Sequence, residues 1–395
     1  MTSATAWLRR RPAGPATAAA GQVTSLELFF DLVFVFTVTQ LTALLGQVDG
    51  WAGAGQATLL LVLLWWMYGG YAWLTNAAPP VTPRRRGLLL LGMTANFVTA
   101  LAIPHATGAD RWTFAIGYLV VVGVHAFVYL TEAARVTAGM VVQLLGWNLI
   151  AAVLVVLGAA LGGRALYVCW VAAVLVEVVV SRLAGFTPLR RLDGGQGPGF
   201  GVAPAHFVER HGLMLLIVLG ESVLAIGVGL SAGADAIGPG QVVFAAVSLA
   251  LAAVLYAAYF GTGEDHRAER ALERAPASRQ HVIALTSYGY ALFVMLLSVV
   301  FTAAGLHHAL AHPTGTLDLA RGAHLAGGVA GFWVGLALFR VALGDRDVLV
   351  RLAGGLLVLP GIWLATSVSA MAALLLLLAG SSALLLLETR GRSPG

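Results

Sequence analysis

The sequence predicts an all-α integral membrane protein that crosses the bilayer about twelve times, with both ends of the chain in the cytoplasm. Of its 395 residues, 59% are hydrophobic and only 10% are charged, and the mean hydropathy is +0.87. A water-soluble fold of this composition would expose large apolar patches. Apolar runs of about 18–24 residues, the length that a helix needs to cross roughly 30 Å of hydrocarbon, recur along nearly the whole chain. No sizeable soluble domain fits between these runs.

Each apolar run is expected to form one transmembrane helix. The first run, residues 26–45, follows three arginines, but it is too long for a signal peptide and lacks a small-residue cleavage site after it. We therefore expect it to be retained as the first helix. The expected helices cover residues 26–46, 57–77, 87–104, 112–131, 140–160, 164–183, 205–231, 240–262, 281–305, 321–343, 350–366 and 369–388.

The arginines predict the orientation of these helices, and the chain contains no lysine. When alternate loops are assigned to the cytoplasm, nineteen arginines fall on that side and only Arg111, Arg164 and Arg321 on the other. Because cytoplasmic loops carry an excess of positive charge, the bias predicts that both termini are cytoplasmic. Arginines scattered between apolar runs are typical of topology signals, so we expect the lipid bilayer and not nucleic acid as the partner of this basic chain.

Two polar stretches organise the chain. The Gly- and Pro-rich residues 184–204 predict a cytoplasmic linker, and the alternating charges of residues 263–280 predict a solvated helical extension. The expected domains are a cytoplasmic tail (1–24), a first six-helix half (25–183), the linker, a second six-helix half (205–388) and a second tail (389–395). Two sets of six helices are a common sign of gene duplication in carriers and channels, and an even number makes the repeats parallel.

Two carboxylates lie on one face of the first helix, four residues apart. Glu27 fits a capping box with Thr24, in which both side chains bond the first free amides of the helix. Asp31 lies about a turn deeper, where capping cannot explain it. A buried carboxylate needs a partner, a proton or water.

The seventh helix carries the densest polar motif, with Glu209, Arg210 and His211 near its start and Glu221 further along. Arg210 and Glu221 share a face but lie roughly 16 Å apart along the axis. Arg210 is expected near the cytoplasmic end, as is Asp31, so an ion pair between the two halves would neutralise both. Glu221 falls near the middle of the membrane. It is either protonated and hydrogen-bonded, or it faces an aqueous cavity in which it can bind a proton or a cation.

Further polar side chains within the expected helices are candidates for lining the same interior, although each could equally join two helices. They are Asn96, His125, Asn148, Glu177 and Ser222. His206, Glu209 and His211 lack the spacing of a zinc-binding helix. The single cysteine, Cys169, excludes disulfides within the chain and cysteine-rich metal sites. No metal or other cofactor is therefore expected.

Aromatic residues gather on the second helix, with Trp65 and Trp66 followed by Tyr68, Tyr71 and Trp73. The outer part of this group suits the aromatic belt at a membrane interface. The two adjacent tryptophans lie too deep for that role, so they either wall a pore or pocket or pack against small residues of neighbouring helices.

The first and seventh helices also carry a family resemblance. They contain Leu26-Glu-Leu-Phe-Phe-Asp-Leu-Val-Phe-Val-Phe36, and Glu209-Arg-His-Gly-Leu213 followed by Leu219-Gly-Glu-Ser222. Together with Trp65-Trp-Met-Tyr68, these segments resemble the bacterial low temperature requirement protein A (LtrA) family over nearly the whole hydrophobic region. The resemblance implies a multi-pass protein of the bacterial inner membrane that is associated with growth in the cold, and it supplies no reaction. A fainter similarity to lysosomal-type potassium channels lacks the serine of their Phe-Ser-Asp motif.

Four functions are compatible with these residues. The first is a secondary transporter of a small solute or ion, coupled to protons through Glu221 and closed on the cytoplasmic side by Asp31 and Arg210. The second is a cation channel lined by the same acids. The third is an intramembrane enzyme that uses Glu221, His211 or Glu209 on a lipid-like substrate. The fourth is a membrane scaffold or sensor. The sequence identifies neither the substrate nor the oligomeric state.

Overall fold

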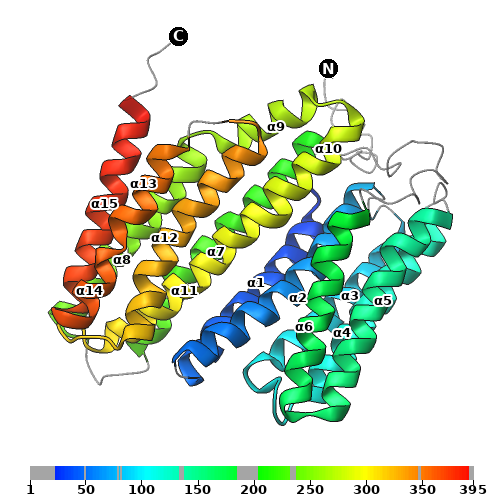
Figure 1. Ribbon diagram of the computed structural model, residues 1–395, viewed down its shortest axis with the longest axis horizontal. Coiled ribbons are helices and arrows are strands. Elements are labelled where there is room, and N and C mark those ends of the chain that lie inside the picture. Colours follow the sequence, from blue (N-terminus) through cyan, green and yellow to red (C-terminus); the bar gives the residue numbers. More distant parts are fainter. Residues whose placement is uncertain are drawn as a thin grey trace, which may run out of the picture.

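The computed structural model describes residues 23–48, 50–77, 80, 82–132, 138–184, 203–231, 237–345 and 348–390, and within these ranges the chain is helical and contains no strand (Figure 1). The predicted all-α class is therefore confirmed. Most of the two predicted tails and of the 184–204 linker lies outside the described residues.

The first half consists of six long helices and one short 3-10 turn. They are α1 (Ser25–Gln47), α2 (Gly50–Ala77), α3 (Pro83–Leu101), η1 (Ile103–His105), α4 (Arg111–Glu132), α5 (Ala138–Leu161) and α6 (Gly163–Ala184). Thr24 and Glu27 form the predicted capping box at the start of α1. The hairpin between α5 and α6 turns on Gly162 and Gly163, whose φ angles of 66° and 52° favour glycine.

The second half is more irregular than the sequence predicted. Its elements are α7 (Pro204–Ser231), α8 (Pro239–Tyr256), η3 (Ala257–Gly261), α9 (Glu264–Arg274), α10 (Ala277–Ala284), η4 (Leu285–Ala291), α11 (Leu292–Ala311), α12 (Leu319–Ala342), α13 (Leu349–Val358), α14 (Pro360–Ser367) and α15 (Ala370–Arg390). Two of these, η3 and η4, are π-helical. The helix expected over 350–366 is divided at Leu359, because Pro360 has no N–H to continue the hydrogen-bond ladder.

Nine helical stretches among the described residues are long and apolar enough to cross a membrane. They are Ser25–Gln47, Gly50–Asn76, Arg111–Thr131, Pro204–Val228, Pro239–Arg274, Arg279–Ala311, Leu319–Ala342, Leu349–Ser367 and Ala370–Arg390. Helices α3, α5 and α6 are not among them. The chain is therefore a multi-pass membrane protein, and the predicted total of twelve spans is not confirmed.

Helix α1 occupies the centre of the bundle and packs against α2, α3, α7 and α11. Helices α3–α6 lie on one side of α1, and α8 and α12–α15 lie on the other (Figure 1). Glycines allow α11 and α12 to approach closely: a Cβ added at Gly328 would lie 2.7 Å from the backbone nitrogen of Thr302. Small residues at a helix interface are how membrane helices gain close packing.

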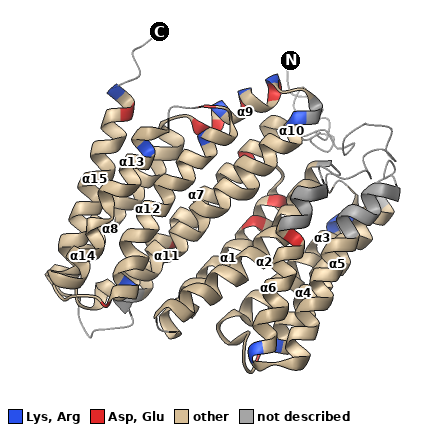
Figure 2. Cartoon of the chain, in the orientation of Figure 1, with Lys and Arg blue, Asp and Glu red and all other residues tan. Residues whose placement is uncertain are grey.

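Charged residues collect at the end of the bundle where α9 lies and α15 finishes, with few at the opposite end (Figure 2). We call this the charged end. Four of these charges are buried together: Glu264 of α9, Arg340 of α12, Arg351 of α13 and Glu388 of α15, hereafter the Glu264 cluster. Glu264 accepts hydrogen bonds of 2.8 Å from both arginines, and Glu388 accepts one of 2.6 Å from Arg351.

The Glu264 cluster corrects one expectation. Residues 263–280 were predicted to form a solvated helix; the helix is present as α9, but its first residue, Glu264, is fully buried. Arg340 and Arg351, which were counted on the cytoplasmic side, lie within the expected helices and donate hydrogen bonds to this acid. Two cations and two anions neutralise one another in this cluster, which makes their burial tolerable.

Candidate functional site

The candidate site lies along the seam between α1 and α7, the first helix of each half. Asp31 contacts Arg210 near the helix starts, and Thr39 contacts Glu221 further along. From the first contact to the second the residue numbers increase on both helices, so α1 and α7 run parallel. By the rise of an α-helix, the two contacts are about 12 Å apart along α1 and about 16 Å apart along α7.

The first contact is the predicted Asp31–Arg210 ion pair, and it is confirmed. Arg210 Nη2 donates to Asp31 Oδ1 at 2.9 Å, and Arg210 Nε lies 3.2 Å and 3.3 Å from the two carboxylate oxygens. Tyr68 Oη of α2 donates to the same carboxylate at 2.9 Å, and Arg210 Nη1 donates to Thr75 Oγ1. Asp31 and Arg210 are 0% and 1% exposed, so the pair is removed from solvent.

Glu27 joins this ion pair while it caps α1. Its Oε2 accepts hydrogen bonds from Thr24 N at 2.9 Å and Thr24 Oγ1 at 2.8 Å. The same oxygen lies 3.3 Å from His206 Nε2, and Oε1 lies 3.6 Å from Arg210 Nη1. The capping and interior roles that the sequence left as alternatives are thus combined. We call Glu27, Asp31, Tyr68, Thr75, His206 and Arg210 the Asp31 cluster.

Aromatic rings surround the cation of the Asp31 cluster. The guanidinium carbon of Arg210 lies 5.8 Å from the ring centre of Phe30 and 5.7 Å from that of Tyr68. Cation–π contacts of this length stabilise a desolvated cation by up to about 2 kcal/mol. Tyr71 is buried and stacks on Phe30 at 5.2 Å. Tyr68 of the α2 aromatic group therefore walls the ion pair directly, and Tyr71 packs behind Phe30.

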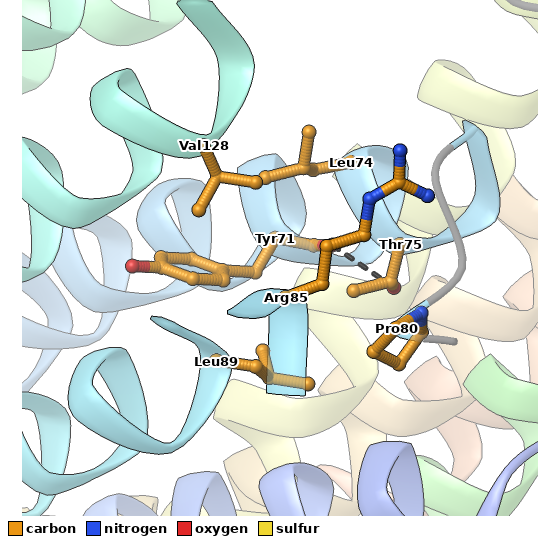
Figure 3. Close-up of a pocket in the computed structure, with 7 residues that line it drawn as sticks. All are labelled: Tyr71, Leu74, Thr75, Pro80, Arg85, Leu89 and Val128. Carbon is orange, nitrogen blue, oxygen red and sulfur yellow. Dashed lines mark hydrogen bonds between the residues drawn. The ribbon is translucent and has the colours of Figure 1, made fainter. Parts of the chain in front are cut away.

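A small cavity adjoins the cluster on the side of α3 and α4 (Figure 3). It holds about 20 Å³, room for roughly one water molecule. Thr75, the partner of Arg210, lines it together with Arg85 of α3, which is half-buried near the charged end. The cavity therefore gives room for about one water molecule next to Thr75, which accepts a hydrogen bond from Arg210.

The second contact surrounds Glu221, a residue only 2% exposed. Thr39 Oγ1 donates to Glu221 Oε2 at 2.8 Å. Beside this hydrogen bond a groove of about 470 Å³ runs between α1 and α7, with Leu32, Phe36 and Leu224 among its apolar walls. Helix α7 has 28 residues, so Glu221 lies about 5 Å beyond its midpoint. The carboxylate thus lies near the middle of a helix that is long and apolar enough to cross a membrane, and it lines the groove.

The remaining α7 candidates lie outside both contacts. His211 is buried in an aromatic group, where Nδ1 bonds Phe207 O at 2.7 Å and the ring lies 4.9 Å from that of Tyr288. Glu209 is exposed, and Ser222 is buried beside Glu221. The structure therefore brings Arg210 and Glu221 to the α1 seam. His211 lies behind the Asp31 cluster, with its ring edge-on to that of Tyr68 at 6.4 Å, and Glu209 lies on the surface.

The first-half candidates lie on α3–α6, away from both contacts. Glu177 of α6 accepts a hydrogen bond of 2.5 Å from Tyr118 of α4. Asn96 of α3 is fully buried, and His125 of α4 packs against Tyr71 with ring centres 5.3 Å apart. Asn148 of α5 is half-buried. Hydrogen-bonded helix pairs such as Tyr118–Glu177 fit the structural role that the sequence left open.

Sequence reasoning missed three members of the two contacts, Tyr68, Thr75 and Thr39. Tyr68 and Thr75 are seven residues apart and so share a face of α2, which was the available signal. Thr39 gave no signal, because threonine is common in membrane helices and often bonds only its own backbone. In the part of the chain that the structure describes, no three His, Cys, Asp or Glu side chains are placed to hold a metal ion.

Comparison with known proteins agrees with this architecture. A family profile described as bacterial low temperature requirement A protein (LtrA) matches residues 22–387. The chain is also similar to uncharacterized protein RA0937 of Rhizobium meliloti (strain 1021), with 26% identity over 293 residues, which cover 73% of this chain and 69% of that protein. The profile match includes α1 and α7 and covers nearly the whole chain, so the protein belongs to the LtrA family.

Proposed function

We propose that this LtrA-family protein is a proton-coupled secondary transporter of a small solute or ion, with Glu221 as its central acid. The observation that carries the proposal is that the contact between α1 and α7 is closed at one depth and open at another. Near the charged end the seam is closed by the buried Asp31 cluster, and near mid-membrane it opens into the groove beside Glu221. A transporter that exposes its site to one side at a time needs one closed level and one open level.

The Asp31–Arg210 pair supplies the closed level. Separating a buried ion pair without new partners leaves two desolvated charges, and losing one partner costs about 3–5 kcal/mol. The pair therefore holds α1 and α7 together until water or a substrate replaces the lost contacts. The cavity next to Thr75 supplies space for such water on the charged side.

Glu221 supplies the coupling. Among the described residues, its carboxylate has a single hydrogen-bond partner, Thr39, and no cation within salt-bridge distance. An ionised carboxylate in such surroundings is costly, so binding of a proton or a cation changes the free energy of this conformation relative to others. Movement of α7 against α1 would follow that change.

The membrane topology that fits this proposal has twelve spans in two parallel halves, with both termini in the cytoplasm of a bacterium. Helices α3, α5 and α6, of 19, 24 and 22 residues, lie within the same bundle and are long enough to complete the set. The parallel contact of α1 with α7 supports an odd number of crossings between them, the five of α2–α6, and therefore six in the first half. The excess of arginines at the charged end supports a cytoplasmic location for that end.

Flux in proteoliposomes tests the proposal. Purified protein is reconstituted, a pH gradient and a membrane potential are imposed, and movement of protons and monovalent cations is compared for wild type and Glu221→Gln. The amide keeps the size of the side chain and a hydrogen-bond acceptor, so we expect normal folding but loss of pH-dependent flux. Glu273→Gln, at an exposed position of α9, is the matched control and should leave flux unchanged. Equal flux in wild type and Glu221→Gln would contradict the proposal.

A further inference from the structure

The groove beside Glu221 is open toward the lipid. Two residues on its rim, Leu32 of α1 and Leu224 of α7, are 53% and 62% exposed. Leu32 shares its face of α1 with Phe29, which is 51% exposed and lies one turn nearer the charged end. Large apolar side chains on the outer surface of a transmembrane helix face hydrocarbon. A molecule dissolved in the bilayer can therefore reach the groove without passing the Asp31 cluster.

The walls of the groove are apolar, and its floor is acidic. Phe36 and Ile217 line the walls, while Glu221 and Thr39 supply the polar atoms. Gly220 leaves space next to the carboxylate, because a Cβ added there would meet no atom within 4 Å apart from its chain neighbours and the backbone of its own helix. The volume of about 470 Å³ lies within the range of small-molecule sites in proteins.

A ligand for this groove must meet two requirements. It needs enough apolar surface to leave the lipid for walls of leucine, isoleucine and phenylalanine without loss. It also needs a positive charge, because Thr39 donates the one hydrogen bond that Glu221 receives among the described residues and no cationic side chain neutralises it. A neutral apolar molecule would leave the carboxylate without a counter-ion, and an anion would be repelled by it.

We propose that the groove binds a lipophilic organic cation that arrives from the membrane, with its positive charge against Glu221 and its hydrocarbon part against the walls. This inference rests on the proposed function and names its substrate class. When the carboxyl group is protonated, binding of the cation releases that proton, so charge is conserved. Cation and proton then compete for one carboxylate, and their movements are coupled in opposite directions.

Binding of two probes of the same size and opposite charge tests the inference. Radiolabelled tetraphenylphosphonium is the cation, and tetraphenylborate is the anion. Equilibrium dialysis against purified protein in detergent should show saturable binding of the cation and none of the anion. Glu221→Gln should weaken cation binding at least tenfold, and Glu273→Gln should not change it. Equal binding of the two probes, or equal cation affinity in wild type and Glu221→Gln, would show simple partitioning into apolar surface and overturn the inference.

A pair of glycine variants locates the site independently of charge. Gly220→Leu fills the space beside the carboxylate and should abolish saturable cation binding. Gly227→Leu makes the same change two turns further along α7, where an added Cβ also meets no atom within 4 Å but the residue does not line the groove. It should bind like wild type. Undiminished cation binding by a folded Gly220→Leu protein would place the site elsewhere.

The binding and flux experiments separate the two proposals. Cation binding that depends on Glu221, without flux of any kind, supports the site and contradicts the transporter. Glu221-dependent proton flux in a protein that does not bind tetraphenylphosphonium supports the transporter and overturns the inference about its substrate.

Discussion

Replacing Arg210 with glutamine tests the ion pair on which the α1–α7 seam depends. Arg210→Gln removes the cation that lies 2.9 Å from Asp31 and 3.6 Å from Glu27. Both carboxylates then remain buried, with His206 as the nearest ionisable base to Glu27 at 3.3 Å. Removing one partner of a buried ion pair costs about 3–5 kcal/mol, and we expect a loss of stability in this range.

Replacing Asp31 with asparagine should destabilise the protein less. In Asp31→Asn, Arg210 keeps its hydrogen bond to Thr75 and its 3.6 Å contact with the ionised Glu27. The asparagine oxygen can still accept from Tyr68, as Asp31 Oδ1 does at 2.9 Å. The loss is then that of hydrogen bonds to a charged group, roughly 1.5–3 kcal/mol.

A double-mutant cycle measures the coupling between the two residues. Unfolding free energies are obtained by titration with SDS in mixed micelles, followed by circular dichroism, for each single variant and for the double variant. Because the double variant leaves no unpaired Asp31 carboxylate, it should be about 1–3 kcal/mol more stable than the sum of the single losses implies. Arg274→Gln, at an exposed site on α9, should change stability by less than about 0.5 kcal/mol. Additive losses, or a loss under about 1 kcal/mol for Arg210→Gln, would refute the reasoning.

Three further predictions concern the packing of the second half and its contact with α2. Gly328→Ala would place a Cβ 2.7 Å from the backbone of α11, so we expect the free energy of unfolding in SDS titration to fall by roughly 1–3 kcal/mol. Gly327→Ala, where an added Cβ meets no neighbouring helix within 4 Å, should be neutral or stabilising. Equal effects of the two variants would contradict the packing. Glu264→Gln leaves two buried arginines with one carboxylate and should lower the free energy of unfolding by about 3 kcal/mol or more. The control is Glu273→Gln, at an exposed position of α9; equal thermal unfolding midpoints for the two variants would show that the Glu264 cluster does not stabilise the protein. Trp65→Phe removes a hydrogen bond of 2.7 Å to a backbone carbonyl of η4, and should lower the same midpoint by an amount equivalent to about 1–3 kcal/mol; an unchanged midpoint would mean that the π-helical carbonyl finds another donor.

The sequence predicted a contact of the site wherever a charge that is unfavourable to bury had a single available partner. Asp31 and Arg210 are both ionisable and both expected at the same membrane depth, so a pair between them was predictable, and it is present. Glu27 was predicted as a cap and is one. Its contact with His206 could not be predicted, because the hydrogen bonds of a cap satisfy the local pattern and give no reason to look for a distant partner.

The Glu264 cluster shows the opposite case. Arg340 and Arg351 lie at the ends of apolar runs, where arginines usually act as topology signals in loops. Nothing in the local pattern separates such an arginine from one that turns inward to a buried acid. The partner of Arg351, Glu388, lies 37 residues further along the chain, and that pairing depends on how α13 and α15 pack. The π-helical segments η3 and η4 were missed for the same reason, since they do not interrupt the apolar periodicity of their helices.

The sequence by itself determined that the chain is helical, lies in a membrane and carries charges on α1 and α7 that are unfavourable to bury. The length of an apolar run and the desolvation free energy of a charge are properties of each segment alone. It also identified the family, which the profile match confirmed. Only the tertiary structure decided which charges meet, that Tyr68 and Thr75 complete the Asp31 cluster, and that Glu221 bonds Thr39 beside a groove with exposed leucines in its walls. Those facts depend on the rotation and depth of one helix against another, and side-chain packing across the whole bundle sets both.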